Sequence, residues 1–416
     1  MPYQQVSIDS RTLQPGATYY ALRGERHDGH DFVAAALAAG AARAIVAESE
    51  RPRCLRAASL PASSDRIVGV PDPLRGLQDA ANAVRRRWGG PVVAVTGSAG
   101  KTTTKEMIAA VLATRFKVLK SGGNLNNHIG VPLTLLALEP GHQIAVVEMG
   151  MNHAGEIARL AEIAEPNVGV FTNVGAAHVG LLGSIEAVAE AKRELATGVR
   201  SIAGAPATLV LNRDDPRVAR FGEGFSGRVV FYPGAGDRRE ANAAAAVATG
   251  AVFGIDAAAA RAALAGLAPL AGRGEIFTAA GMTFINDSYN ANPEAMAYML
   301  DVLARTPATR RVAVLGEMRE LGAHSAALHR DLGTRLAAPG GPDAVVAVGG
   351  DARIMLEAAR AAGFGGATFF CQDATAAGNI LINFLRPGDA VLFKASRGIR
   401  LEAALERVRQ SAAAGH

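Results

Sequence analysis

A glycine-rich loop at residues 96–103 has the sequence TGSAGKTT and could bind the phosphates of a nucleotide. Its glycines let the backbone approach phosphate oxygens, and the first N–H groups of a following helix add a positive field. Lys101 would place a positive charge on the outer phosphates, and the hydroxyl of Thr102 suits Mg²⁺. The strict P-loop pattern has glycine where this chain has Val95, so the loop is a shortened variant. We predict an ATP site formed by Gly97, Ser98, Ala99, Gly100, Lys101, Thr102 and Thr103.

Two more polar side chains follow predicted strands. Glu148 comes directly after residues 144–147, and His178 lies in the loop after residues 168–171. Ligands bind at the carboxyl ends of strands in open α/β sheets, so Glu148 could hold a second Mg²⁺ there. Each residue also has a plainer interpretation, Glu148 as a capping or ion-paired loop residue and His178 as a hydrogen-bonded loop residue.

Lys192 lies on a predicted helix that begins near Ser184. The apolar residues at helical spacing around it are Ile185, Val188, Ala189, Leu195 and Ala196. Lys192 shares their face, so we expect it to point inward. Snorkelling would explain that placement. A lysine with a lowered pKa could instead be carbamylated by CO₂ and become an anionic metal-binding group, and the sequence leaves both readings open.

Three loops rich in asparagine or other polar residues also follow predicted strands or precede helices. They lie at residues 123–128, 286–293 and 394–398. Singly, such loops are usually turns. Together, at the carboxyl ends of strands, they predict a cleft for a polar substrate.

The elements that position these residues alternate between strand and helix. A continuous apolar strand at 92–95 precedes the glycine-rich loop, and a helix with an apolar face follows it, which argues against a plain turn with an exposed lysine. This alternation predicts an α/β fold in three domains: a small N-terminal α/β domain, a central P-loop domain built on a parallel sheet with crossover helices, and a C-terminal Rossmann-like domain. The predicted boundaries are 1–88, 89–270 and 271–416.

The composition narrows the class of protein. The formal charge is +5, from 43 basic and 38 acidic residues, but no basic run contains interleaved aromatics, so we expect no nucleic-acid partner. Cys54 and Cys371 have no partner at metal-ligand spacing and suit a reducing compartment. The N-terminal residues lack an apolar signal core, and the most apolar window, 241–255, is too short to span a bilayer. We expect a cytoplasmic monomer without a membrane span.

On these motifs the chain resembles the Mur ligase family, over nearly its whole length. Residues 96–103 are similar to the family's ATP loop, and residues 123–127, 129–132 and 147–150 to its central signatures. Residues 9–11, 15–16 and 21–32 look like its UDP-sugar-binding first domain, and residues 287–293 and 394–397 like its C-terminal domain. Within the family, the resemblance is to the ligases that add D-alanyl-D-alanine to UDP-N-acetylmuramoyl-tripeptide through an acyl phosphate, in cytoplasmic peptidoglycan precursor synthesis.

The resemblance implies a role for each motif residue. The residues implied to act in catalysis are Lys101, Lys192, His178 and Arg397, and the metal ligands are Thr102, Glu148, His178 and Lys192, with Lys192 carbamylated. Arg273, Asp287 and Asn290 would contact ATP outside the loop. The residues implied to bind the substrates are Ser10, Arg11, Asn124, Asn126, Asn127, Lys394 and Ser396. ATP and Mg²⁺ are the implied cofactors.

One connection departs from the family pattern. Between the strand at 229–232 and the helix from Asn242, the family has more strands and a His-Asn pair, whereas this chain has only residues 233–241. We therefore expect the adenine contact to differ. Two alternatives stay open: a related ligase that adds a different amino acid, such as a diaminopimelate- or lysine-adding enzyme or a folylpolyglutamate synthase, and a degenerate ATP-binding homologue.

Overall fold

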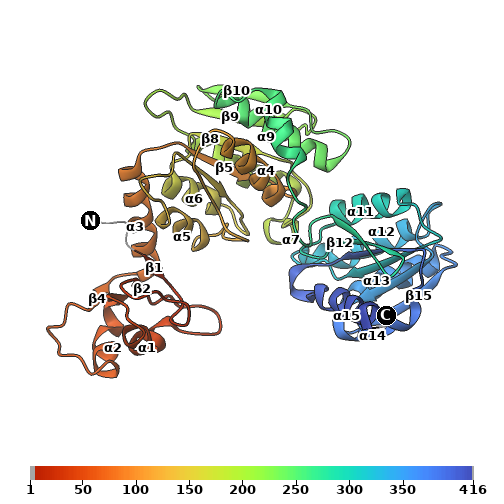
Figure 1. Cartoon of the computed structure of the whole chain (residues 1–416), viewed down its shortest axis with the longest axis horizontal. Coiled ribbons are helices and arrows are strands. Elements are labelled where there is room, and N and C mark those ends of the chain that lie inside the picture. The colour runs from red at the N-terminus through yellow and green to blue at the C-terminus, as the bar shows by residue number, and fades with distance from the viewer. Residues whose placement is uncertain (1–4, 415–416) are drawn as a thin grey trace. The chain divides into compact units, whose positions relative to one another are not determined.

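The computed structural model describes residues 5–414, which form three β-sheets flanked by helices (Figure 1). The chain divides into two compact units. The first comprises the described parts of Met1–Asn173 and Glu190–Gly266, and the second those of Val174–Ala189 and Leu267–His416. Each unit is described by itself below.

The first sheet of the first unit is small and parallel, in the order β1-β2-β3-β4. Its strands are β1 (Val6–Ser7), β2 (Thr18–Tyr20), β3 (Arg43–Ala47) and β4 (Ile67–Val70). Its helices are α1 (Val33–Ala38) and α2 (Arg51–Ala57), with 3₁₀ turns η1 (Gly29–Phe32) and η2 (Glu48–Glu50). Tyr19, Val33 and Ile67 are among the buried side chains of its core.

Helix α3 (Pro73–Trp88) leads from this sheet into the next part of the chain. Asp72 caps its start by accepting a hydrogen bond from Leu74 N, and Gly89, at φ 72°, ends it. Its buried Arg85 donates from Nε to Ala164 O at 2.7 Å, which ties α3 to the end of helix α6 (Glu156–Ala164).

The second sheet, also in the first unit, is parallel throughout, in the order β10-β9-β8-β5-β7-β6. Its strands are β5 (Val92–Thr96), β6 (Val118–Lys120), β7 (Ile144–Glu148), β8 (Val168–Phe171), β9 (Thr208–Asn212) and β10 (Arg228–Tyr232). All residues of β5, β7 and β8 are buried, as expected of a parallel sheet covered on both faces. From β5 the chain runs first to one side of the sheet and later to the other, so β5 ends at a topological switch point.

The helices of the first unit that follow these strands are α4 (Lys101–Ala113), α5 (Gly130–Leu136), α6, η3 (Val218–Gly222), α9 (Arg238–Val252) and α10 (Ala257–Ala265). After β8 come α7 (Val179–Leu182), which belongs to the second unit, and α8 (Ile185–Gly198), which belongs to the first unit from Glu190 onward. Helix α4 packs against α9 and α10, which lie beside it in Figure 1. Ile108, Val111 and Leu112 of α4 are fully buried. This packing fixes the start of α4, where the glycine-rich loop ends.

The third sheet belongs to the second unit and has the order β11-β12-β16-β13-β14-β15. Its strands are β11 (Glu275–Ala279), β12 (Met282–Asp287), β13 (Arg310–Gly316), β14 (Ala344–Val348), β15 (Ala367–Cys371) and β16 (Asp389–Lys394). Its helices are α11 (Pro293–Arg305), η4 (Gly322–His324), α12 (Ser325–Leu336), α13 (Ala352–Ala361), α14 (Ala374–Phe384), η5 (Arg397–Ile399) and α15 (Glu402–Ala414). Separate clusters of buried side chains cover its two faces.

The predicted α/β fold with a central parallel sheet is confirmed, and the strands predicted at 67–70, 168–171 and 344–348 have those bounds. The third sheet is mixed, because β11 pairs antiparallel with β12. The sequence pattern did not predict β1, β6 and β11. The first two have only two and three residues, and β11 is an edge strand with alternating burial, so none has the continuous apolar run of an interior strand.

Candidate active site

The glycine-rich loop joins β5 to α4 and has a backbone that only glycine adopts easily. Gly97 has φ 151° and Gly100 has φ 81°. A Cβ atom at Gly97 would lie 1.8 Å from Thr172 Oγ1, which no side chain can tolerate. The two glycines are therefore required by this loop's conformation and packing, and not only by a bound phosphate.

Side chains from the end of β8 hold the loop in shape. Asn173 accepts from Ala99 N at 2.9 Å through Oδ1, and its Nδ2 donates to Ala99 O at 3.1 Å. Thr172 Oγ1 also donates to Ala99 O, at 2.7 Å. Lys101 Nζ donates to Gly97 O at 2.7 Å. The sequence reading missed Asn173, whose signal was the same as that of Glu148: a polar residue just past the end of a buried strand.

Asn242 of α9 is a second residue that the sequence reading left out of the site. Its Oδ1 accepts from Thr104 Oγ1 at 3.1 Å, and a Cβ atom at Gly100 would lie 2.6 Å from it. The connection shortened at residues 233–241 therefore still delivers this asparagine to the glycine-rich loop. Asp237 starts α9 by capping Arg239 N and Glu240 N.

Glu148, at the end of β7, is 2% exposed and held at three points. Oε2 accepts from Thr102 Oγ1 at 2.7 Å, and Oε1 accepts from Asn126 Nδ2 at 2.8 Å. Its backbone N donates to Ser121 Oγ at 3.2 Å. A buried carboxylate and a hydroxyl in contact beside a phosphate-binding loop are hard oxygen donors, so these residues fit Mg²⁺.

The described residues 5–414 contain no group of three or more His, Cys, Asp or Glu side chains that could hold a metal by themselves. A cation at Glu148 and Thr102 would need further oxygen ligands. Mg²⁺ characteristically takes these from nucleotide phosphates and water, with only one or two protein ligands.

The three asparagines of the 123–128 loop have different surroundings. Asn126 contacts Glu148, whereas Asn127 Oδ1 accepts from Gly130 N at 2.8 Å and Ile129 N at 3.1 Å, at the start of α5. Asn124 is exposed, and its carbonyl accepts from Asn126 N. The structure therefore places only Asn126 at the Glu148 carboxylate.

Lys192 of α8 points inward as its spacing predicts, with a residue exposure of 2%. Burial lowers its pKa well below the ordinary value for lysine, and the positive charge of Lys101 lowers it further. A neutral amine is therefore favoured at this position.

In the second unit, polar residues that follow β12 and β16 lie together. Lys394, at the end of β16, is 2% exposed, forms an ion pair with Asp287 and donates to Asn290 O at 3.0 Å. Ser396 Oγ accepts from Arg319 N at 2.9 Å. The paired register of β12 and β16, with Asp287 opposite Lys394, explains why loops more than a hundred residues apart meet.

Two predicted arginines share an aromatic neighbour in the same unit. The guanidinium of Arg273 lies 4.0 Å from the ring centre of Tyr289, and that of Arg397 lies 5.5 Å from it. Arg397 also pairs with Glu402. These cation–π contacts orient both side chains around the loop that carries Asp287 and Asn290.

His178 belongs to the second unit, whereas Glu148, Thr102 and Lys192 belong to the first. It precedes α7 in a left-handed conformation, with φ 67°. Its Nδ1 lies 3.1 Å from Glu320 Oε2. In the same loop, Ala176 N donates to Glu294 Oε1 at 2.7 Å.

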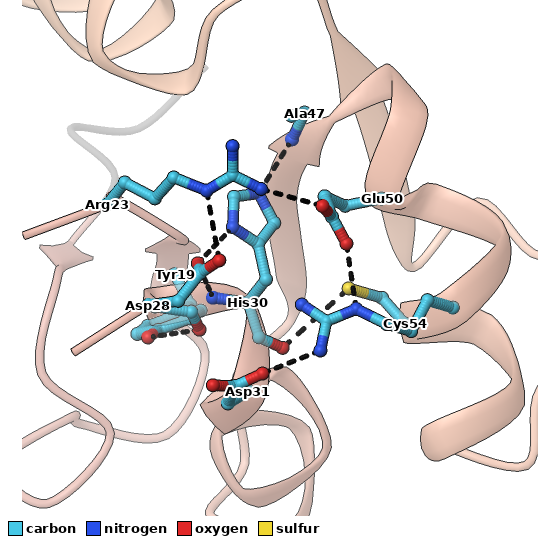
Figure 2. A network of polar contacts seen from close by, with 10 residues as sticks. Tyr19, Arg23, Asp28, His30, Asp31, Ala47, Glu50 and Cys54 are labelled. Carbon is cyan, nitrogen blue, oxygen red and sulfur yellow. Dashed lines mark hydrogen bonds and ion pairs between the residues drawn. The ribbon is translucent and has the colours of Figure 1, made fainter.

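At the first sheet, Arg11 is exposed and paired with Asp9, and Ser10 lies beside it. A larger polar network, shown in Figure 2, shapes the neighbouring loop. Its members are Arg23, Asp28, His30, Asp31, Glu50 and Arg53. Arg23 bonds both Asp28 and Glu50, and Arg53 bonds both Glu50 and Asp31, so the two arginines join the loop to the start of α2.

The centre of this network is a buried histidine. Asp28 Oδ1 lies 2.5 Å from His30 Nδ1, and the opposite ring nitrogen, Nε2, accepts from Ala47 N at 3.0 Å. Burial acts to raise the pKa of Asp28, but hydrogen bonds from His30 and Arg23 outweigh it and lower the pKa to about 2. The carboxylate is therefore charged under all ordinary conditions.

No helix among residues 5–414 combines the length and apolar character needed to cross a membrane.

Three family models match successive parts of the chain. Residues 2–85 match "Mur ligase family, catalytic domain", residues 95–259 match "Mur ligase middle domain", and residues 272–397 match "Mur ligase, glutamate ligase domain".

Curated relatives and solved structures agree with these matches. The UDP-N-acetylmuramoyl-tripeptide–D-alanyl-D-alanine ligase of Synechocystis sp. is 37% identical over 431 residues, which cover 97% of this chain and 91% of the relative. The ligase of the same name from Bacillus subtilis is 35% identical over 436 residues, covering 95% and 91%. A crystal structure of MurF from Acinetobacter baumannii has a TM-score of 0.84 at 31% identity, covering 98% of this chain and 93% of that one. MurF from Thermotoga maritima in complex with ADP also has a TM-score of 0.84, at 28% identity, covering 100% and 99%.

Proposed function

The chain belongs to the Mur ligase family, and we propose that its glycine-rich loop, Glu148 and Lys192 serve the reaction of that family's D-alanyl-D-alanine-adding ligases. That reaction joins D-alanyl-D-alanine to UDP-N-acetylmuramoyl-tripeptide with ATP, giving ADP and phosphate, in peptidoglycan precursor synthesis. The observation that carries the proposal is the contact of Glu148 with Thr102, next to the phosphate-binding loop.

The first chemical step is attack of the tripeptide's terminal carboxylate on the γ-phosphate of ATP. An acyl phosphate forms and ADP leaves. Lys101 neutralises charge on the outer phosphates, and the backbone N–H groups at the start of α4 bind phosphate oxygens. Mg²⁺ held by Thr102 and Glu148 supplies further charge neutralisation when bound.

In the second step the amine of D-alanyl-D-alanine attacks the acyl carbon, phosphate leaves, and the amine loses a proton to give the amide. The acyl phosphate must be kept from water until the amine arrives. Lys394 and Ser396 are proposed to bind the substrates at this stage, and Arg397 and His178 are proposed to act in catalysis.

Lys192 is proposed to act as a carbamate. The neutral amine nitrogen attacks the carbon of CO₂, a nitrogen–carbon bond forms and one proton leaves to water. The product is an anionic carbamate in place of the buried neutral amine. The lowered pKa of Lys192 favours the neutral amine that this reaction needs.

The remaining residues are proposed to bind the ends of the two nucleotides. Arg273, Asp287 and Asn290 would contact ATP, joined by Asn242 beside the loop. Ser10, Arg11 and the network around His30 would bind the UDP-sugar end of the second substrate, with Asn124, Asn126 and Asn127 nearer its peptide. We further propose domains at 1–88, 89–270 and 271–416, and a cytoplasmic monomer without a nucleic-acid partner.

The test is an ATP-dependent phosphate-release assay. We expect release only when UDP-N-acetylmuramoyl-tripeptide and D-alanyl-D-alanine are both present. Release with a single D-amino acid in place of the dipeptide would overturn the substrate assignment. Lys101→Ala is the inactive control and should lower kcat by at least 10²-fold, on the order of losing one stabilising contact to developing charge.

A further inference from the structure

Lys105 is a fully buried lysine that the reaction does not use. It lies on α4, one helical turn after Lys101, and its side chain has 0% exposure. Burying an ammonium group costs free energy that an apolar side chain of the same length would not. Packing alone therefore does not account for a lysine at this position. The polar contacts of its ammonium group must offset the cost of burial.

The Lys105 ammonium has two described partners. Nζ donates to Ser121 O at 2.6 Å and lies 3.0 Å from Glu106 Oε1. Glu106 also pairs with Lys120, so its carboxylate would have a cation without Lys105. The contact that only Lys105 makes is the one to Ser121.

Ser121 connects this lysine to the carboxylate at the nucleotide site. It follows β6, is fully buried, and its Oγ accepts from Glu148 N at 3.2 Å. Its own N donates to Val146 O, which fixes it against β7. Residues 122–125 then lead to Asn126, whose amide bonds Glu148 Oε1.

Helix α4 thus reaches Glu148 by two routes. Thr102 bonds the carboxylate directly, and Lys105, three residues later on the same helix face, fixes Ser121, which accepts from the backbone of Glu148. We propose that Lys105 is a positioning residue for the Mg²⁺ site: through Ser121 it fixes the position of the Glu148 carboxylate relative to Thr102. This inference rests on the proposed role of Glu148 in holding Mg²⁺.

The test measures metal binding without turnover. Mn²⁺, whose free form gives a paramagnetic resonance signal, is titrated into the full-length protein at saturating ADP. Lys105→Met keeps the length of the side chain and removes its ammonium. We expect the apparent Kd for Mn²⁺ to rise about tenfold, the loss typical when a group that orients a metal ligand is removed.

Lys120→Met is the matched control. It removes the other cation paired with Glu106, but Lys120 is 49% exposed and pairs through its side chain with Glu106 rather than with Ser121. We expect this variant to bind Mn²⁺ with the wild-type Kd. An equal loss in both variants would assign the effect to Glu106 and overturn the proposal.

Two further variants, Ser121→Ala and Glu148→Gln, test the two other residues on the route from Lys105 to the metal. Ser121→Ala keeps the carbonyl that Lys105 bonds but removes the acceptor of Glu148 N, so it should also weaken Mn²⁺ binding. Wild-type affinity in this variant would break the route from Lys105 to Glu148 even if Lys105→Met does not fold. Wild-type Mn²⁺ affinity in folded Lys105→Met, or failing that in Ser121→Ala, overturns the role of Lys105. Glu148→Gln separates the premise from the inference: if it binds Mn²⁺ like wild type, the metal role of Glu148 itself is wrong.

Discussion

Two lysines of the first unit show how surroundings set what one residue type can do. Lys101 is half-buried at the start of α4 and donates to the carbonyl of Gly97, so its positive charge lies at the glycine-rich loop. Lys192 is buried on α8, and both burial and Lys101 lower its pKa. The first suits binding of an anion and the second suits reaction as a neutral amine.

Replacement of Lys192 tests the carbamate. Lys192→Ala should lower kcat on the order of 10²-fold, because the proposed carbamate anion is lost, and acetate or formate should restore part of the activity by occupying the space. The measurement is phosphate release with and without acetate or formate at about 100 mM, because a small carboxylate binds weakly and needs a high concentration to occupy the site. Lys101→Ala should show no such rescue; acetate restoring both variants equally would contradict the prediction.

Asp28 should give the first sheet a pH-dependent stability. Its pKa in the folded protein is about 2, lowered from 3.8, so its bonds to His30 and Arg23 stabilise the fold fully above pH about 4. That contribution is lost as the pH falls towards about 2. We expect Asp28→Asn to lower the free energy of unfolding by about 1 kcal/mol at pH 6, after allowance for solvent screening.

The measurement for Asp28 is urea unfolding at several pH values between 6 and 3. The difference between wild type and Asp28→Asn should shrink as the pH falls. Asp65→Asn, which changes an exposed carboxyl group in the same part of the chain, should cost little at any pH. A difference that stays constant from pH 6 to pH 3 would show that Asp28 does not titrate as stated.

At the scale of elements, the strand–loop–helix unit from β5 to α4 is held in shape by its protein neighbours. Thr172 and Asn173, after β8, supply hydrogen bonds to the loop backbone, and Asn242 of α9 closes against Gly100. A loop held in this way loses little conformational entropy on binding phosphate. The neighbouring strands therefore contribute to ATP affinity without needing to touch ATP.

A glycine substitution in this loop measures the constraint. Gly97→Ala would place a methyl group 1.8 Å from Thr172 Oγ1 at φ 151°, so we expect it to destabilise the protein by about 1–3 kcal/mol and to weaken ADP binding. Calorimetric titration with ADP and urea unfolding give the two quantities. Gly122→Ala is the control, since nothing lies within 4 Å of its added Cβ atom. Equal effects from the two alanines would refute the constraint.

At the scale of the whole molecule, the chain forms two compact units, each with its own buried side chains. The segment Val174–Ala189, which contains His178, belongs to the second unit although the residues on either side of it belong to the first. Its contacts with Glu294 and Glu320 explain that membership. The residues proposed for one reaction are therefore divided between two units.

Thermal unfolding should reflect this division. We expect more than one calorimetric transition, with a calorimetric enthalpy larger than the van't Hoff enthalpy. Ile285→Val, in the second unit, should lower the free energy of unfolding of one transition by about 0.5–1.5 kcal/mol. Val146→Ala, in the first unit, should lower that of the other transition. A single two-state transition that both variants lower equally would contradict the prediction.

The sequence by itself determined the loops that carry chemistry and the strands before them. A glycine-rich loop between an apolar strand and a helix is a local pattern, and so is the helical spacing of apolar residues that predicts an inward-facing Lys192. Both follow from residue types a few positions apart, and the full burial of β5 and of Lys192 agrees with them.

Only the tertiary structure decided which of these residues meet. Asn126 and Asn127 are neighbours in the sequence, yet one bonds Glu148 and the other starts α5. Asn173, Asn242 and Lys105 reached the site through strand order and helix packing, which no local pattern encodes. The contact of Lys105 with Ser121 depends on the pairing of β6 with β7. Because β6 is so short, its sequence does not predict a strand there.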